Sequence, residues 1–330
     1  MANIKGVAAK AGLSVACVSK YLKNPESVLP SSRERIEAAI AELNYIPSVA
    51  AQSLRTKRSY TVKAITESIR NPFFAEAFEY IRLALSRQGY TTVLQTTDAK
   101  PAEPADFAGV DGVIICLVDD GETADRVARL TGGKLPVVSI CGVPPAGDLS
   151  YVLVDIEGGA RAATRHLGQC GKKRLAYVGG SEDCYLSTLK RKGFAEAAGE
   201  MGIVLRPEDI FEGPSSFQGG TAAAEEMIRR GQFPDGIVCE NDIIAAGCLR
   251  MLLDHGVKVP EEIAVTGFDN ILIARILTPS LTSAALQMEE ICGEACRLLV
   301  DRMDGKPAAC SRFGTELMIR SSTVGREQTE

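Results

Sequence analysis

Apolar side chains recur at helical intervals in the first two stretches of the chain. The positions are Ile4, Val7, Ala8 and Ala11, followed by Val15, Val18 and Leu22. This spacing gives each stretch one apolar face, as an amphipathic helix requires. Gly12 can end the first helix because glycine accepts the left-handed backbone, and Ser14 can cap the start of the second. The pattern therefore predicts two short helices joined by a glycine turn.

A third amphipathic helix is predicted from Ser31. Ser31 and Glu34 have the spacing of a capping box. The apolar stripe is Ile36, Ala39, Ile40 and Leu43. Asn44 can end the helix in the left-handed conformation, and Pro47 prevents its continuation. Three such helices form a helix-turn-helix unit, whose second helix enters a DNA major groove; a small helical docking domain is the alternative.

From residue 61 onward, short apolar runs alternate with amphipathic stretches. The predicted strands are 62–65, 91–94, 112–117, 136–140, 151–154, 174–178, 236–239 and 263–267, and helices between them include 73–88, 158–168 and 243–255. Repeated strand–helix units predict parallel sheets with right-handed crossovers. In such sheets a ligand cleft lies at the carboxyl ends of the strands. Between 97 and 110, Pro101 and Pro104 prevent a continuous helix.

The charge is divided unequally along the chain. The net charge of the 330 residues is −5, which by itself argues against a nucleic-acid partner. Residues 1–60, however, hold nine Lys and Arg against four Glu, whereas the remaining 270 hold 28 basic against 38 acidic residues. A small basic module on an acidic body is typical of a DNA-binding segment attached to another domain.

Other features bear on compartment and chemistry. No apolar run approaches the roughly 18–20 residues of a membrane span, and Lys10 would interrupt a secretion signal, so we expect a cytoplasmic protein without a membrane partner. The ten cysteines are scattered and form no CxxC pair, which predicts reduced thiols.

Enzyme motifs are missing from the sequence. There is no GxxxxGK[ST], no GxGxxG after a strand, no GxSxG and no HExxH. The two histidines, His166 and His255, fall in helical patterns and are expected to be structural. We therefore expect no catalytic residue, no metal site and no cofactor.

The N-terminal segment AAKAGLSVACVSKYLKNPESV, with ERIEAAIAELNYIPSVAAQSLRTKRS after it, closely resembles the head of the LacI/GalR (lactose repressor/galactose repressor) family of transcription regulators. The resemblance implies a DNA-binding head over residues 1–58, a hinge helix at about 47–55, and an effector-binding and dimerisation core over 59–330. In the hinge, Leu54 would be an apolar wedge in the minor groove, and Ala51 would let paired hinge helices approach. The implied DNA contacts come from the second helix and its ends and from the hinge segment. They are Ser14, Val15, Ala16, Cys17, Ser19, Lys20, Asn24, Ala51, Leu54, Arg55 and Lys57.

The resemblance continues through the body in IleArgAsnProPhePhe (69–74), LysArgLysGlyPhe (190–194), GluAsnAsp (240–242) and the segment 259–270. It implies a periplasmic-binding-protein type I body, with two doubly wound α/β lobes at about 59–150 plus 283–305 and 151–282 plus 306–324. The implied effector contacts are Phe73, Phe74, Lys190, Asn241, Asp242 and Asp269. Core packing is the alternative for the two phenylalanines, and a turn or helix cap is the alternative for Asp269.

Three departures from the family pattern bear on recognition. Lys190 replaces an arginine and so lacks its bidentate fork. Cys141 and Gly142 stand where an Asp-Arg or Asp-Trp pair is usual, which removes an acceptor for sugar hydroxyls. Cys17 replaces a common threonine.

We expect a homodimeric transcription regulator, a repressor, whose binding to a pseudo-palindromic double-stranded DNA operator is controlled by a small-molecule effector. The effector would be a carbohydrate or a related metabolite. The alternatives are a solute-binding protein, and a sugar-processing α/β enzyme with an appended helical domain.

Overall fold

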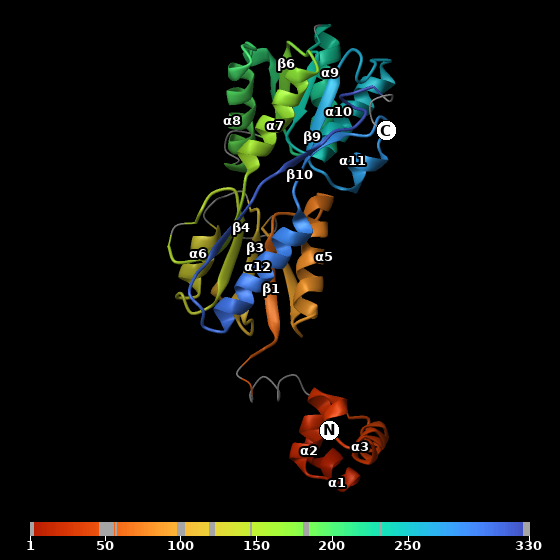
Figure 1. Ribbon diagram of the computed structural model, residues 1–330, viewed down its shortest axis with the longest axis vertical. Helices are drawn as coiled ribbons and strands as arrows, with labels where there is room; N and C mark the ends of the chain where they lie inside the picture. Colours follow the sequence, from red (N-terminus) through yellow and green to blue (C-terminus); the bar gives the residue numbers. More distant parts are fainter. Residues whose placement is uncertain are drawn as a thin grey trace. The chain divides into compact units, whose positions relative to one another are not determined.

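The computed structural model describes residues 3–45, 56, 58–97, 103–118, 123–145, 147–180, 185–231 and 233–325. The chain divides into two units, Met1–Ser59 and Tyr60–Glu330, which we call the head and the body (Figure 1). Across the described ranges, no helix is both long enough and apolar enough to cross a bilayer.

Over residues 3–45, the head contains three α-helices around a small core. They are α1 (Ile4–Ala11), α2 (Val15–Lys23) and α3 (Pro30–Glu42), with a short 3-10 helix at Pro25–Ser27. Gly12 ends α1 with φ +62°, and the Ser14 hydroxyl accepts a hydrogen bond from the Cys17 amide at 3.1 Å. Both junction residues thus act as predicted. The buried core residues are Val7, Ala8, Ala11, Val18, Ile36, Ala39 and Tyr45.

The start of α3 differs from the prediction. The helix begins at Pro30, and its N-cap is Leu29, which makes no side-chain capping bond. The expected Ser31–Glu34 capping box is therefore wrong. Proline at the first helical position explains the difference, because its φ is already helical and it has no N–H that needs a partner. The predicted left-handed Asn44 is confirmed, with φ +46°.

The first lobe of the body is a six-stranded sheet covered by helices on both faces. The strand order is β11-β5-β4-β3-β1-β2. The strands are β1 (Thr61–Thr66), β2 (Thr91–Thr96), β3 (Gly112–Cys116), β4 (Val137–Cys141), β5 (Ser150–Val154) and β11 (Cys310–Phe313). Helices α5 (Pro72–Ser86) and α12 (Met288–Met303) pack in the core on one face, and α6 (Thr123–Leu130) packs in the core on the other.

The second lobe repeats this three-layer arrangement. Its strand order is β12-β10-β9-β8-β6-β7. The strands are β6 (Leu175–Gly179), β7 (Ile210–Glu212), β8 (Gly236–Cys239), β9 (Ala264–Asp269), β10 (Thr282–Ala285) and β12 (Glu316–Met318). The helices are α7 (Ile156–Gln169), α8 (Tyr185–Glu200), α9 (Phe217–Arg230), α10 (Asp242–Asp254) and the short α11 (Leu272–Ile276), with a 3-10 helix at Pro207–Asp209.

The chain crosses between the lobes three times, after β5, after β10 and after β11 (Figure 1). This corrects three of the expected lobe assignments. Residues 283–285 of β10, predicted in the first lobe, pair in parallel with β9 in the second-lobe sheet. Strand β5, predicted in the second lobe, pairs in parallel with β4, and β11 pairs with β5 in the same first-lobe sheet. The first crossing follows Val154, where the Asp155 side chain caps α7 by accepting from the Gly158 amide at 2.8 Å.

The proline-containing segment forms no α-helix over its described residues 103–110. It contains only a four-residue 3-10 helix, Pro104–Phe107, as the prolines predict. Lys63, a buried residue of β1, holds this turn in place. Its Nζ donates to the Asp106 carbonyl and, at 2.8 Å, to Gln95 Oε1, and it lies 5.2 Å from the centre of the Phe107 ring.

All nine cysteines in the described ranges are free thiols, which confirms the prediction for them. Five are buried: Cys116, Cys239, Cys248, Cys292 and Cys296. Burial also raises the pKa of Cys296 to about 12, so its thiol is neutral at ordinary pH.

Candidate functional site

The predicted DNA-contact residues of α2 lie on an exposed face. Ser14, Val15, Ala16 and Lys20 are exposed, while Cys17 and Ser19 are half-buried. Positions 15, 16, 19 and 20 share one side of the helix, and Val18, which is fully buried, anchors the opposite side. The Ser14 hydroxyl also serves as the helix cap, so this residue has a structural role whatever else it contacts.

The remaining predicted DNA contacts are in two places. Asn24 is exposed directly after α2, and its Oδ1 accepts from the Glu26 amide at 3.1 Å. The expected hinge contacts Ala51, Leu54, Arg55 and Lys57 lie outside the described residues.

A cavity of about 480 Å³ lies between the two lobes of the body. Its walls come from residues that follow β1, β3, β6 and β8, and from the last residue of β9. The cavity therefore occupies the carboxyl ends of the parallel strands, where open α/β sheets bind ligands. Five of the six predicted effector residues line it: Phe73, Phe74, Lys190, Asn241 and Asp269.

Phe73 and Phe74 form the aromatic wall at the start of α5. Their rings meet edge to face with centres 5.2 Å apart. Both side chains are also buried in the core of the first lobe. Core packing and cavity lining, which we set as alternatives, thus coexist here, and packing fixes the orientation of the wall.

Lys190 is a buried cation held in one position. Its Nζ donates to the Glu240 carbonyl at 2.9 Å and lies 4.3 Å from the centre of the Phe268 ring. A carbonyl and an aromatic face both stabilise an ammonium group. Lys190 therefore supplies fixed positive charge beside the carboxylates of the cavity.

Asn241 is the N-cap of α10. Its Oδ1 accepts from the Ile244 amide at 2.9 Å, and its Nδ2 donates to the Ser215 hydroxyl at 3.2 Å. These two bonds fix the side-chain amide at the cavity wall. The sequence pattern alone gave no sign that Ser215 would take part.

Asp269 is the last residue of β9 and is buried at the cavity wall. Burial raises the pKa of its carboxyl to about 7; the positive charge of Lys190 opposes this shift, and the negative charges of Glu240 and Glu76 add to it. Asp269 also has φ +99°, a conformation that is rare outside glycine. A strained residue with a shifted pKa in a cleft is typical of a functional position.

Asp242 does not line the cavity, so its expected role as a polar contact is wrong. It is fully buried, and its carboxylate accepts from the Ser283 hydroxyl at 2.6 Å and from the Ile271 amide at 2.9 Å. The Ser283 hydroxyl in turn accepts from the Asn270 amide at 3.0 Å. Successive residues at a helix start point in different directions, so Asn241 faces the cavity while Asp242 holds the turn that follows Asp269.

Sequence reasoning missed Glu240. This residue is buried and lines the cavity. Its carboxylate accepts from the Gly180 amide and, at 3.1 Å, from the Ser215 hydroxyl. The available indication was its place directly after the apolar strand 236–239, where a charged side chain must face the end of the sheet.

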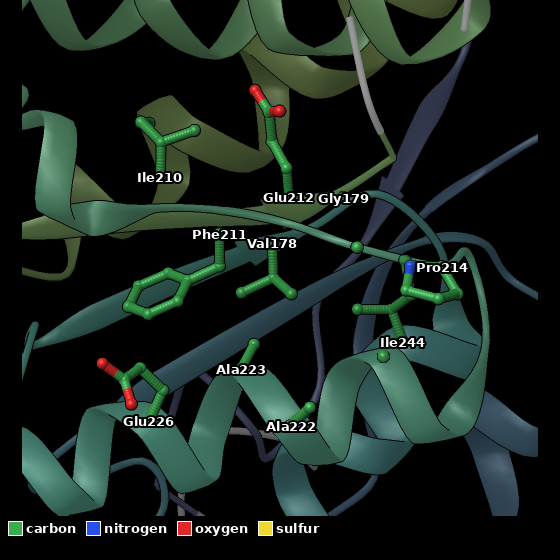
Figure 2. Close-up of a pocket in the computed structure, with 12 residues that line it drawn as sticks. Val178, Gly179, Ile210, Phe211, Glu212, Pro214, Ala222, Ala223, Glu226 and Ile244 are labelled. Atoms are coloured by element: carbon green, nitrogen blue, oxygen red, sulfur yellow. The ribbon is translucent and has the colours of Figure 1, made fainter.

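Another cavity, of about 340 Å³, lies within the second lobe between β6, β7 and α9. Figure 2 shows Phe211 and Val178 directed toward α9 and Glu212 directed away from it. The Glu212 carboxylate is paired with Arg191, and Glu226 is paired with Arg229 and Arg230. Because its two acids already have partners, this cavity lacks the convergent polar groups of the interlobe cavity.

Comparisons with known proteins identify the family of both units. Residues 3–48 match the model for bacterial regulatory proteins of the lacI family, and residues 164–323 match a periplasmic binding protein-like domain. The HTH-type transcriptional repressor CytR of Escherichia coli (strain K12) is 30% identical over 330 residues, which cover 98% of this chain and 96% of CytR. The chain belongs to the LacI family of bacterial regulatory proteins.

Solved structures of LacI-family members share the whole architecture. The complex of the transcriptional regulator CelR with cellobiose aligns with a TM-score of 0.71 at 29% identity, over 98% of this chain and 100% of CelR. The Lac repressor dimer bound to operator and the anti-inducer ONPF aligns with a TM-score of 0.82 at 23% identity, over 98% and 99% of the two chains, which shows a common fold. The predicted fold class, a helix-turn-helix head with a two-lobed α/β body, is thus confirmed. The protein is a DNA-binding transcription regulator of the LacI family.

Proposed function

We propose that the protein is a homodimeric repressor whose affinity for a pseudo-palindromic operator is set by a small-molecule effector in the interlobe cavity. The observation that carries the proposal is the convergence of Lys190, Glu240, Asn241 and Asp269 on a cavity that both lobes line. A ligand that contacts both lobes can change the angle between them, which is how a binding event can alter the spacing of two heads.

On the DNA side, we propose that α2 enters the major groove. Val15 and Ala16 offer methyl contacts of the kind made with thymine, and Lys20 can neutralise a phosphate. The hinge residues Ala51, Leu54, Arg55 and Lys57 belong to the proposal through the family resemblance. The CelR–cellobiose and Lac repressor–operator complexes support the pairing of DNA and small ligand in one chain.

For the dimer, we propose a face built on α5, β2, α10 and α11. It exposes Leu83, Val93, Leu253, Leu272 and Ile276, of which the last two are 61% and 68% exposed. Helices α5 and α11 both lie on the right-hand side of the body in Figure 1. Exposed aliphatic side chains on one side of a folded body are typical of a protein contact.

The effector we propose is rich in hydroxyl or amine donors, as carbohydrates and related metabolites are. Glu240 and Asp269 are buried acids, and buried carboxylates bind such donors strongly because few other partners are available. We propose that the protein binds its ligands without catalysing a reaction, since the relatives that match it over nearly its whole length are regulators. We also propose that it needs no metal or cofactor and acts in the cytoplasm.

Selection of DNA from a random library by the full chain tests the DNA side. We expect a motif with two-fold symmetry, and affinity that falls with salt by a log-log slope of about −0.9 per phosphate neutralised. Lys20→Ala should weaken binding and reduce that slope by about one, whereas Lys258→Ala, at an exposed position of the body, should change neither. Absence of a motif, or salt-independent binding, would contradict the proposal.

A thermal-shift screen of the full chain against sugars, sugar phosphates, sugar acids and nucleobases tests the effector side. A true effector should raise the melting temperature of the native chain and fail to raise that of Asp269→Ala. If a hit stabilises both proteins equally, the cavity assignment is wrong.

A further inference from the structure

The direction of the Asp269 side chain depends on the backbone that carries it. The residue lines the interlobe cavity, and among the described residues none donates a hydrogen bond to its carboxylate. Asp269 and Asn270 both have positive φ, of +99° and +56°. Residues other than glycine keep this conformation where their surroundings hold them in it. The contacts that fix this turn therefore also fix the direction of the carboxylate.

The turn is held from two sides, by Asp242 and by Arg320. The guanidinium of Arg320 donates from Nη2 to Asn270 Oδ1 at 2.5 Å and from Nη1 to the Leu281 carbonyl at 2.6 Å. One planar group thus connects the turn after β9 with the loop before β10. A lysine would not reproduce this fork, because its single ammonium group cannot occupy both donor positions.

The backbone at Arg320 is anchored to the second-lobe sheet. The Arg320 amide donates to the Thr282 hydroxyl of β10 at 2.8 Å. Two residues further along the chain, the Ser322 carbonyl accepts from the Val265 amide of β9 at 2.9 Å. The guanidinium therefore reaches the turn from a fixed position in the sheet.

We propose that Arg320 is a positioning residue of the effector site, which acts through Asn270 to keep the Asp269 carboxylate directed into the interlobe cavity. This inference rests on the proposed function, because Asp269 is the proposed contact of the effector. Arg320 is not among the described residues that line the cavity, so its effect passes through the turn. Without the fork, the strained residues relax and the carboxylate turns toward water.

This role differs from a direct effect of the Arg320 charge on Asp269. Besides burial, the causes that shift the pKa of Asp269 are the charges of Lys190, Glu240 and Glu76. The charge of Arg320 acts on Asp242 instead, where it opposes the rise in pKa that burial causes. Loss of Arg320 should therefore change the titration of Asp269 by moving the carboxylate.

A double-mutant cycle on the full chain tests the proposal without a ligand. Urea denaturation between pH 4 and pH 8 gives the unfolding free energies of the native chain, Asp269→Asn, Arg320→Lys and the double variant. In the native chain, the stabilisation by Asp269→Asn should grow with pH, because the buried carboxyl must lose its proton. In Arg320→Lys the carboxyl reaches water, so this growth should shrink to about half or less.

Two further variants separate position from charge. Arg320→Lys keeps the charge and Arg320→Met removes it, and both should give the same result because both lack the fork. Arg312→Met, at an exposed position of β11, is the matched control and should leave the pH dependence unchanged.

A merely structural role of Arg320 would give a different result. It would lower the stability by the same amount at every pH and leave the effect of Asp269→Asn unchanged, which would overturn the proposal. An effect of Asp269→Asn that does not depend on pH in the native chain would also overturn it, because the carboxyl would then not be held in the buried wall.

Ligand binding separates this inference from the proposed function. A compound from the screen of sugars, sugar phosphates, sugar acids and nucleobases that requires Asp269 should bind Arg320→Lys at least about tenfold more weakly in calorimetric titration. It should bind Arg312→Met as tightly as the native chain. Equal affinity for Arg320→Lys would refute the positioning role while the proposed function stands. A screen in which no compound requires Asp269 would contradict the proposed function, and the cycle would still decide whether Arg320 fixes the carboxylate.

Discussion

Replacing Asp269 by asparagine should stabilise the folded protein at pH 8 and abolish the effector response. The Asp269 carboxyl is buried, and its pKa is raised to about 7 from the ordinary 3.8. Between these two values the folded chain holds a proton that the unfolded chain has lost. Stability must therefore fall as the pH rises from about 4 to about 7. Asparagine has no charge to bury, so the stability of the variant does not fall in this pH range for this reason.

The magnitude follows from the size of the shift. Three pKa units at 1.36 kcal/mol each amount to about 4 kcal/mol. This cost is fully present above pH 7 and absent below about pH 4, where both states are protonated. Asparagine also tolerates positive φ better than most residues, so the backbone of the turn should be retained.

The assay is urea denaturation of the native chain and Asp269→Asn at several values between pH 4 and pH 8. The difference in unfolding free energy between the two proteins should grow with pH and level off above pH 7. Asp148→Asn, at a side chain that is 86% exposed, is the control and should show no such trend. A difference that stays constant with pH, or a variant that is less stable at pH 8, would refute the reasoning.

Three further changes probe the turn, the head and the dimer face. Asp242→Ala leaves the Ile271 amide and the Ser283 hydroxyl without their buried acceptor. Urea denaturation should show that the free energy of unfolding falls by about 2–5 kcal/mol, and an unchanged denaturation midpoint would contradict this positioning role of Asp242. Gly12→Ala forces a residue with a side chain to adopt φ +62°, which should destabilise the head by about 1–2 kcal/mol. Amide hydrogen exchange in residues 4–42 of the full chain measures this loss, and unchanged protection of these amides would contradict the prediction. Ile276→Asp should raise the dimer dissociation constant at least tenfold in sedimentation, with Val204→Asp as the matched control, and equal dissociation of both variants would exclude the proposed face.

The sequence predicted those parts of the fold that depend on local pattern. All eight predicted strands exist, and Gly12 and Ser14 act where helix α1 ends and α2 begins. These features are set by periodicity and by backbone preferences, both of which are readable from neighbouring residues.

Features that depend on long-range pairing were not predictable in the same way. Strand β5 has the same apolar alternation whichever sheet it joins, and only its pairing with β4 assigns it to the first lobe. The short strands β10, β11 and β12 carry too few residues for a periodic pattern.

Five of the six predicted effector residues line the cavity, and the errors concern the direction in which side chains point. Glu240, Asn241 and Asp242 are consecutive, yet the first two line the cavity and the third is buried behind it. The sequence shows that polar groups gather at this strand end, but not which way each one points. The strain at Asp269 is likewise visible only in its backbone angle.

The central claim is that DNA and a small molecule bind to one coupled system. The most direct test titrates the full chain with its selected DNA in the presence and absence of a ligand from the screen, and titrates the ligand in the presence and absence of the DNA. Coupling is reciprocal, so the factor by which the ligand changes DNA affinity must equal the factor by which DNA changes ligand affinity. We predict equal factors of about 5–150, corresponding to 1–3 kcal/mol, which Asp269→Ala reduces to one. A DNA affinity that is the same with and without saturating ligand would contradict the account.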